Sequence, residues 1–100
     1  MGKLITVFWR DIPSHIIFKT KSGKFKKQMS PRFEKAIDRA AMRAGKGSSD
    51  AYMADWRREI VKIKTDDPQS IVDQEIELLE QMFSDDLLEK TVKSKGIKEE

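Results

Sequence analysis

Residues 30–45, SPRFEKAIDRAAMRAG, divide the chain into a part with strand patterns and a part dominated by helix patterns. Ser30 stands where a helix N-cap is expected, and Pro31 suits the first turn because its missing N–H costs no hydrogen bond there. Gly45 is placed to end the helix. The apolar residues in between fall on one helix face; they are Phe33, Ile37, Ala40, Ala41 and Ala44. The stretch therefore predicts an amphipathic helix.

Three strand patterns precede this helix. Residues 3–12, KLITVFWRDI, are apolar on both faces and rich in β-branched and aromatic residues, which is typical of an interior strand. Beyond the break expected at Pro13, residues 15–21, HIIFKTK, predict a second strand. A Ser-Gly pair then predicts a tight hairpin into residues 24–29, KFKKQM, whose lysines are of the kind that protects a sheet edge.

The second half continues with helix and strand signals in turn. A short helix is expected at SDAYMADW (49–56), a strand at REIVKIKT (58–65), a helix from Pro68 to about Phe83, and a last helix at SDDLLEKTVKSKG (84–96). The predicted order is β-β-β-α-α-β-α-α. We expect one α+β domain over residues 1–95, with helices on one face of a mainly antiparallel four-stranded sheet, and a frayed tail at 96–100.

Composition excludes several kinds of site. The 100 residues contain no cysteine and one histidine, which excludes disulfides, thiolate metal sites and cysteine nucleophiles. No run approaches the ~20 apolar residues of a membrane span. We therefore expect a cytoplasmic protein that holds no metal or cofactor of its own.

Charge is distributed unevenly along the chain. Residues 1–50 carry 12 Lys and Arg against 4 Asp and Glu, whereas residues 51–100 carry 8 against 13. This dipolar pattern suits an acidic partner, and it equally suits ion pairing of the two halves within the fold.

Two candidate sites are weak. Ser14 precedes His15, but neighbours on a strand point to opposite faces, so we expect no catalytic dyad. The turn at 44–49, AGKGSS, lacks the phosphate-loop spacing, although a helix start after glycines suits an anion. Its candidate anion-binding residues are Lys46, Ser48 and Ser49, and a small-ligand binder or enzyme that uses this turn is a further hypothesis.

A set of cations on the predicted hairpin, the first helix and the segment after Trp56 forms the main candidate. Its members are Lys24, Lys26, Lys27, Arg32, Lys35, Arg39, Arg43, Arg57 and Arg58. With no catalytic pattern beside them, these residues predict binding to an acidic protein surface. Nucleic-acid binding by the same face is the alternative, but the sequence lacks RNA-recognition and GXXG motifs.

Several segments also carry a family resemblance. ITVFWRDIP near the start, RFEKAIDRAAMRAG and SDAYMADWRR resemble the small proteobacterial proteins labelled "virulence factor" and the C-terminal part of the HEAT-repeat-bearing conserved virulence factor C. The resemblance covers roughly residues 4–83. The residues that carry it are Ile37, Asp38, Ala40, Ala41, Met42, Gly45, Asp50, Tyr52 and Trp56.

The resemblance implies a role but supplies no catalytic residues. The resemblance implies that genes of this family often lie in clusters with genes for cobalamin- and tetrahydrofolate-dependent methyl transfer. It therefore implies a non-catalytic accessory protein that docks on a larger enzyme subunit, such as a corrinoid methyltransferase of a divided methionine synthase.

Overall fold

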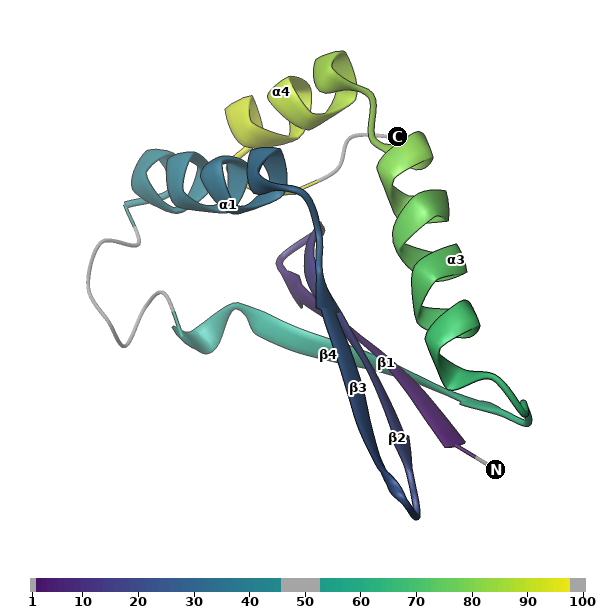
Figure 1. Ribbon diagram of the computed structural model, residues 1–100. Helices are drawn as coiled ribbons and strands as arrows, with labels where there is room; N and C mark the ends of the chain where they lie inside the picture. Colours follow the sequence, from purple (N-terminus) through teal and green to yellow (C-terminus); the bar gives the residue numbers. More distant parts are fainter. Residues whose placement is uncertain (1, 46–52, 98–100) are drawn as a thin grey trace.

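The computed structural model describes residues 2–45 and 53–97. They form an α+β domain with four antiparallel strands in one sheet (Figure 1). The elements are β1 (Gly2–Trp9), β2 (Ile12–Thr20), β3 (Gly23–Gln28), α1 (Pro31–Arg43), β4 (Trp56–Ile63), α3 (Pro68–Met82) and α4 (Asp85–Lys93). The predicted fold class is confirmed. Half of the predicted second helix, residues 49–52, lies outside the described residues.

The sheet order is β3-β2-β1-β4, so β1 lies inside the sheet and β3 forms one edge. Both positions confirm the sequence predictions. The fourth strand starts earlier than expected, because Trp56, which the sequence assigns to a helix, pairs with Trp9 as the first residue of β4. The local sequence around Trp56 is compatible with a helix or a strand, and pairing with Trp9 of β1 selects the strand.

The boundary predicted at Pro13 is wrong, since Pro13 lies within β2. Val7 pairs with His15 and Phe8 pairs with Pro13, which leaves Ser14 as an extra residue in a β-bulge. A bulge tolerates proline because the ladder is locally interrupted there and the missing N–H breaks no regular pair. The chain therefore turns from β1 into β2 at Arg10 and Asp11 instead.

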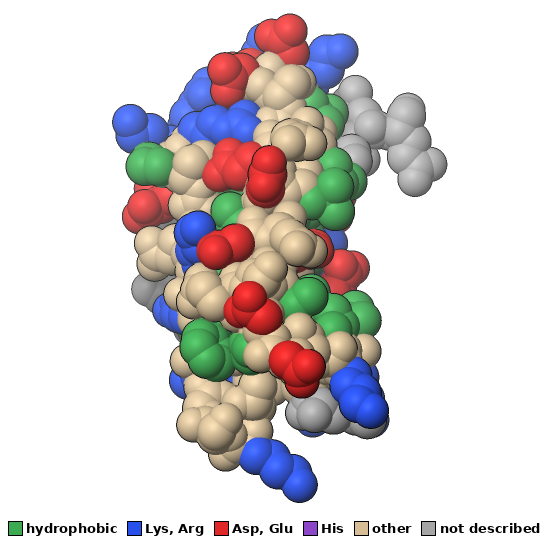
Figure 2. All heavy atoms as spheres, turned by 45° about the vertical axis from the view of Figure 1, so that its right-hand side comes forward, with side chains coloured by type: hydrophobic (Ala, Val, Ile, Leu, Met, Phe, Trp, Pro, Cys, Tyr) green, Lys and Arg blue, Asp and Glu red, His purple; other side chains and the backbone are tan. Residues whose placement is uncertain are grey.

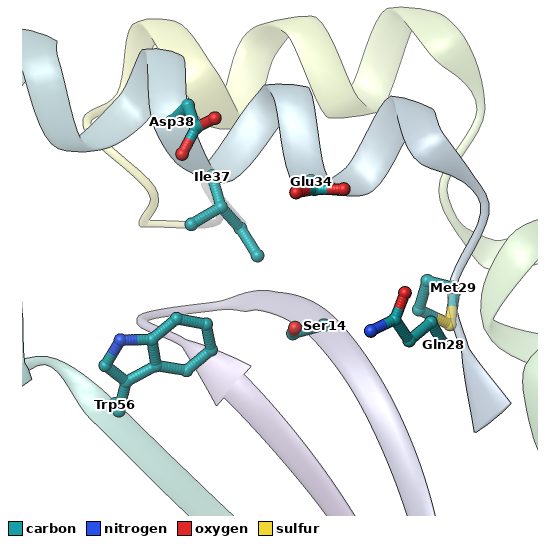
Figure 3. Close-up of a pocket in the computed structure, with 7 residues that line it drawn as sticks. All are labelled: Ser14, Gln28, Met29, Glu34, Ile37, Asp38 and Trp56. Carbon is teal, nitrogen blue, oxygen red and sulfur yellow. The ribbon is translucent and has the colours of Figure 1, made fainter. Parts of the chain in front are cut away.

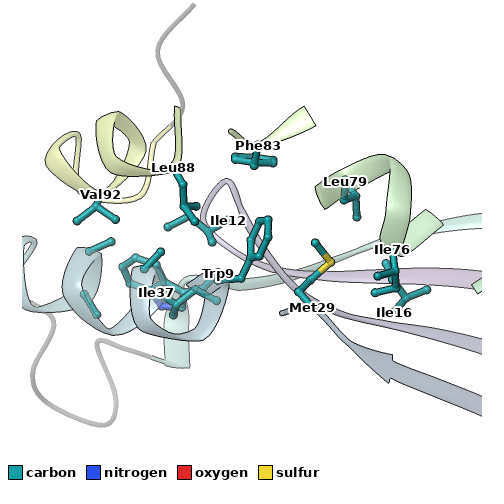
Figure 4. Packing of buried hydrophobic residues seen from close by; sticks show 14 of the residues in the cluster. Trp9, Ile12, Ile16, Met29, Ile37, Ile76, Leu79, Phe83, Leu88 and Val92 are labelled. Carbon is teal, nitrogen blue, oxygen red and sulfur yellow. The ribbon is translucent and has the colours of Figure 1, made fainter. Parts of the chain in front are cut away.

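The helices gather on one side and at one end of the sheet. α3 runs along β2 and β3, while α1 and α4 pack side by side beyond the end where β1 turns into β2 (Figure 1). The core follows this arrangement (Figure 4): Ile16 lies against Ile76 of α3, whereas Trp9 and Ile12 lie among residues of α1 and α4. None of these helices is long and apolar enough to cross a membrane.

Side-chain hydrogen bonds cap the starts of α3 and α4. Asp67 accepts a hydrogen bond from the Ser70 amide at the start of α3, and Ser84 accepts one from Leu87 at the start of α4. Ser30 occupies the N-cap of α1, but its hydroxyl makes no cap hydrogen bond and is directed to α3 instead. Gly96, assigned to the tail by the sequence, is buried, and its carbonyl accepts from the Asp11 amide at 2.9 Å.

Candidate functional site

The strand register assembles one face of the sheet from three rows that cross all four strands. Directly opposed residues of antiparallel strands point to the same side, so each row shares a face. From β3 to β4 the rows are Lys24, Lys19, Lys3 and Lys62; then Lys26, Ile17, Ile5 and Ile60; then Gln28, His15, Val7 and Arg58. We call these twelve residues the open face.

The charged residues of the open face are all basic. Six of its residues are Lys or Arg, and none is Asp or Glu. All six are exposed: Lys3, Lys19, Lys24, Lys26, Arg58 and Lys62. Neighbouring strands lie about 4.8 Å apart. Like charges so close together repel one another, and an anion placed over the face relieves that repulsion.

The centre of the open face is apolar. Ile5 and Val7 are buried, Ile17 is half-buried, and Ile60 on β4 is exposed. Neither Ile5 nor Val7 belongs to the buried cluster that joins the sheet to the helices, which takes Leu4, Ile16 and Phe18 from the alternate positions. The accessible surface thus combines a small aliphatic area, made by Ile60 and part of Ile17, with a cationic surround.

The opposite face of the sheet, here called the helix face, neutralises its charges internally. Lys27 lies on the helix face and donates to Asp73 of α3 at 2.9 Å. This hydrogen bond holds the pKa of Asp73 below its usual value. Figure 2 shows the side on which α3 lies, where acidic side chains follow one another along the molecule. The sequence placed Lys27 and Lys26 in one patch, and the strand pleat separates them.

Arg32 is also engaged within the fold. Its guanidinium donates to Glu80 of α3 at 3.1 Å and to Asp85 of α4 at 3.1 Å, and it lies over the Phe33 ring. Glu80 in turn accepts from the amide and the hydroxyl of Ser30 at 2.8 and 2.9 Å. Burial opposes ionisation of Glu80, but these hydrogen bonds prevail and lower its pKa.

Arg39 and Arg57 have partners as well. Arg39 makes a two-pronged contact with Glu89 of α4, with both distances 2.8 Å. Arg57 donates to the Arg10 carbonyl and to Glu59, both at 2.8 Å, and stacks on Phe8. Both cations therefore have structural roles within the fold: Arg39 pairs with a carboxylate from the acidic second half of the chain, and Arg57 pairs with Glu59 on its own strand.

The remaining predicted cations divide between two places. Lys24, Lys26 and Arg58 lie on the open face, whereas Lys35 and Arg43 are exposed on α1. No carboxylate of the described residues forms an ion pair with any of these five. The predicted anion-binding residues Lys46, Ser48 and Ser49, together with Tyr52, lie outside the described residues.

Sequence reasoning missed Lys3, Lys19 and Lys62, which complete the open face. Their signal is present in the sequence, because they share the period-two positions of their strands with Ile5, Ile17 and Ile60. Pairing of β4 with β1 is needed to join the positions into one surface, and single-strand patterns do not contain that information.

Ser14 and His15 interact, contrary to the prediction from strand geometry. Ser14 Oγ lies 3.1 Å from His15 Nδ1, because the bulge breaks the strict alternation of side chains. Burial, Lys26 and Arg58 lower the pKa of His15, which favours its neutral form. Within the described residues no hydrogen bond joins His15 to a carboxylate, so the pair lacks the third member of a hydrolase triad.

Two hollows lie near this pair. One of about 350 Å³ opens at the end of the open face, between β1, β2 and the start of β4; its lining residues include Val7, His15, Met53, Trp56, Arg57 and Arg58. The other, of about 230 Å³, lies beneath α1 (Figure 3), lined by Ser14, Gln28, Met29, Glu34, Ile37, Asp38 and Trp56. Trp56 borders both. Within residues 2–45 and 53–97, no three His, Asp or Glu residues gather as metal ligands.

Comparison with protein families places this architecture. The model of the family described as "Virulence factor" matches residues 7–92, which span every strand and helix above except residues 2–6 of β1 and Lys93 at the end of α4. The chain belongs to this family. The match confirms the resemblance seen in the sequence, and it extends past Phe83 into α4. No curated protein matches the chain. No solved structure matches it either.

Proposed function

We propose that this member of the virulence factor family is a non-catalytic binding module that docks on an acidic surface of a larger protein through its open face. The observation that carries the proposal is the set of three cross-strand rows, with six cations and no acid around an aliphatic centre. An apolar centre surrounded by polar groups is the usual anatomy of a protein interface.

The internal ion pairs support the choice of this surface. Lys27, Arg32, Arg39 and Arg57 are held by carboxylates of the fold. Their exchange for contacts with a partner would break existing hydrogen bonds and leave Asp or Glu unpaired. The open-face cations have no such competitor among the described carboxylates, so an acidic partner gains their full attraction.

The centre of the open face favours a protein over a nucleic acid. Modules that bind single strands on a sheet place aromatic rings where bases stack. Here the accessible central residues are Ile17 and Ile60, which are aliphatic, and Trp56 lies at the end of the sheet. Aliphatic side chains suit aliphatic and aromatic side chains of a partner protein better than they suit bases.

Affinity capture tests the proposal. The chain is immobilised, native cell extract is applied after nuclease treatment, and retained proteins are quantified by mass spectrometry. The corrinoid methyltransferase subunit that the family resemblance implies is the first candidate to look for. We expect a partner with an acidic surface to be retained by the wild-type chain and lost from Lys19→Glu/Lys26→Glu.

A second variant serves as the matched control. Arg39→Glu/Arg43→Glu makes the same change of charge on α1, and we expect it to retain the partner. Equal retention by both double variants would contradict the proposal. Binding of a fluorescent single-stranded oligonucleotide with affinity that falls steeply as salt rises, and that depends on Lys19 and Lys26, would favour the nucleic-acid alternative.

A further inference from the structure

β4 is an edge strand of eight residues whose outer side is unoccupied by the rest of the described chain. Half of the backbone N–H and C=O groups of an edge strand point away from the sheet. Apart from the ladder with β1, no hydrogen bond within the described residues reaches the backbone of residues 57–63. The edge therefore offers a row of free backbone donors and acceptors.

Apolar side chains flank this edge on both faces of the sheet. Ile60 on the open face is 57% exposed, and Val61 on the helix face is 55% exposed. Val61 remains uncovered because α3 packs on β2 and β3, near the opposite edge of the sheet from β4. A strand added beside β4 would cover both residues at once, whereas a partner docked on one face of the sheet would cover only one of them.

The other edge strand is less suited to pairing. β3 has six residues, all exposed, of which three are lysines. β4 also carries charged residues at half of its positions, so charge alone does not distinguish the two edges. The edges differ instead in length and in attachment, because Lys27 ties β3 to α3 through Asp73.

Charge argues against a second copy of β4 as the added strand. A symmetric antiparallel pair centred on Ile60 places Arg58 of one copy opposite Lys62 of the other. A pair centred on Glu59 places Glu59 opposite Glu59. Like charges in directly opposed positions are destabilising. A strand with carboxylates opposite Arg58 and Lys62 forms attractive pairs instead.

We infer that the β4 edge binds an extended acidic segment of the partner protein as a fifth, antiparallel strand. This inference rests on the proposed function and specifies how that partner docks. In the order in which the segment runs, its residues are acidic opposite Lys62, apolar opposite Val61 and Ile60, basic opposite Glu59, and acidic opposite Arg58. Backbone pairing supplies affinity, and the side-chain pattern supplies selectivity.

A peptide with this pattern tests the inference directly. The probe is Thr-Glu-Val-Ile-Lys-Glu-Thr with blocked ends, added at millimolar concentration to the isotope-labelled chain. Amide hydrogen exchange is then followed by NMR. We expect about tenfold slower exchange at the outward-pointing amides of β4, with little change in β3. The peptide with Glu and Lys exchanged is expected to leave β4 unchanged.

Two controls separate strand addition from attraction by charge alone. The same peptide with alternate backbone amides N-methylated keeps its charges but cannot pair with an edge, so we expect it to lose binding. Val61→Lys changes the edge without touching the open face and should weaken binding. Leu78→Lys, an equally exposed apolar position on α3, should not.

The outcomes distinguish the two proposals. Binding by the N-methylated peptide, or binding without protection of β4, would overturn strand addition while leaving the open face as the docking surface. Absence of binding by Thr-Glu-Val-Ile-Lys-Glu-Thr, the unmodified probe, would also overturn strand addition. The docking proposal itself is judged separately, by the capture experiment with Lys19→Glu/Lys26→Glu.

Discussion

Lys27 Nζ lies 2.9 Å from Asp73 Oδ1, an ion pair that joins edge strand β3 to α3. The preceding residue, Lys26, pairs across the strands with Ile17 and lies on the opposite, open face. Two adjacent, exposed lysines thus differ in their surroundings, since Lys27 has a carboxylate partner and Lys26 has none among the described residues. The chain offers a matched pair of positions with which to test the open face.

Glu80 links the start of α1 to α3 and should matter for stability. Glu80→Gln removes the charge that accepts from Ser30 and Arg32. We expect a loss of about 2 kcal/mol in the free energy of unfolding at pH 7, measured by urea denaturation. Glu77→Gln, on the exposed side of the same helix, should change stability by less than about 0.5 kcal/mol.

The effect of Glu80 should also depend on pH. Its pKa in the folded chain is lowered from 4.5, so its contribution is fully present above the unfolded-state pKa and is lost as the pH falls through the folded-state value. The difference between wild type and Glu80→Gln should therefore shrink as the pH falls below about 4.5. A difference that stays constant down to pH 3 would rule out this role of the carboxylate.

His15 should report the positive potential of the open face. Burial, Lys26 and Arg58 lower its pKa from 6.5, so we expect an NMR titration midpoint below that value. Lys26→Gln should raise the midpoint, because one of the nearby cations is removed. Lys27→Gln on the helix face should leave the midpoint nearly unchanged. Equal shifts from the two variants would show that the faces are not electrically distinct.

The two tryptophans should differ in their contribution to stability. Trp9 is fully buried among α1, α4 and the sheet, so Trp9→Ala should cost about 3–5 kcal/mol. Trp56 is half-buried between the two hollows, and Trp56→Ala should cost about 1–2 kcal/mol. Thermal unfolding followed by circular dichroism separates the two cases, and an equal cost would place Trp56 in the core.

Much of the fold follows from local patterns. Two apolar faces identify β1 as an interior strand, and Ser30, Pro31 and Gly45 bound α1, because these signals depend only on neighbouring residues. The sequence predicts a capping role for the hydroxyl of Ser30 and does not reveal its partner Glu80, which is 50 residues away. Trp56 was assigned to a helix, and only its pairing with Trp9 shows the strand.

The candidate site was less predictable than the fold. The sequence identified the cations but grouped Lys26 with Arg32 and Arg39, whose carboxylate partners come from the distant helices α3 and α4. It also missed Lys62, which joins the open face only because β4 pairs with β1. Contacts between distant segments decide which cations remain free to bind a partner, and these contacts cannot be read from the composition.

The most direct test compares Lys26→Glu with Lys27→Glu. Each immobilised variant and the wild-type chain are incubated with the same nuclease-treated extract, and the retained partner is quantified by mass spectrometry. We expect Lys26→Glu to lose the partner and Lys27→Glu to retain it, with both variants folded by circular dichroism. Equal retention by the two variants, or loss confined to Lys27→Glu, would contradict docking through the open face.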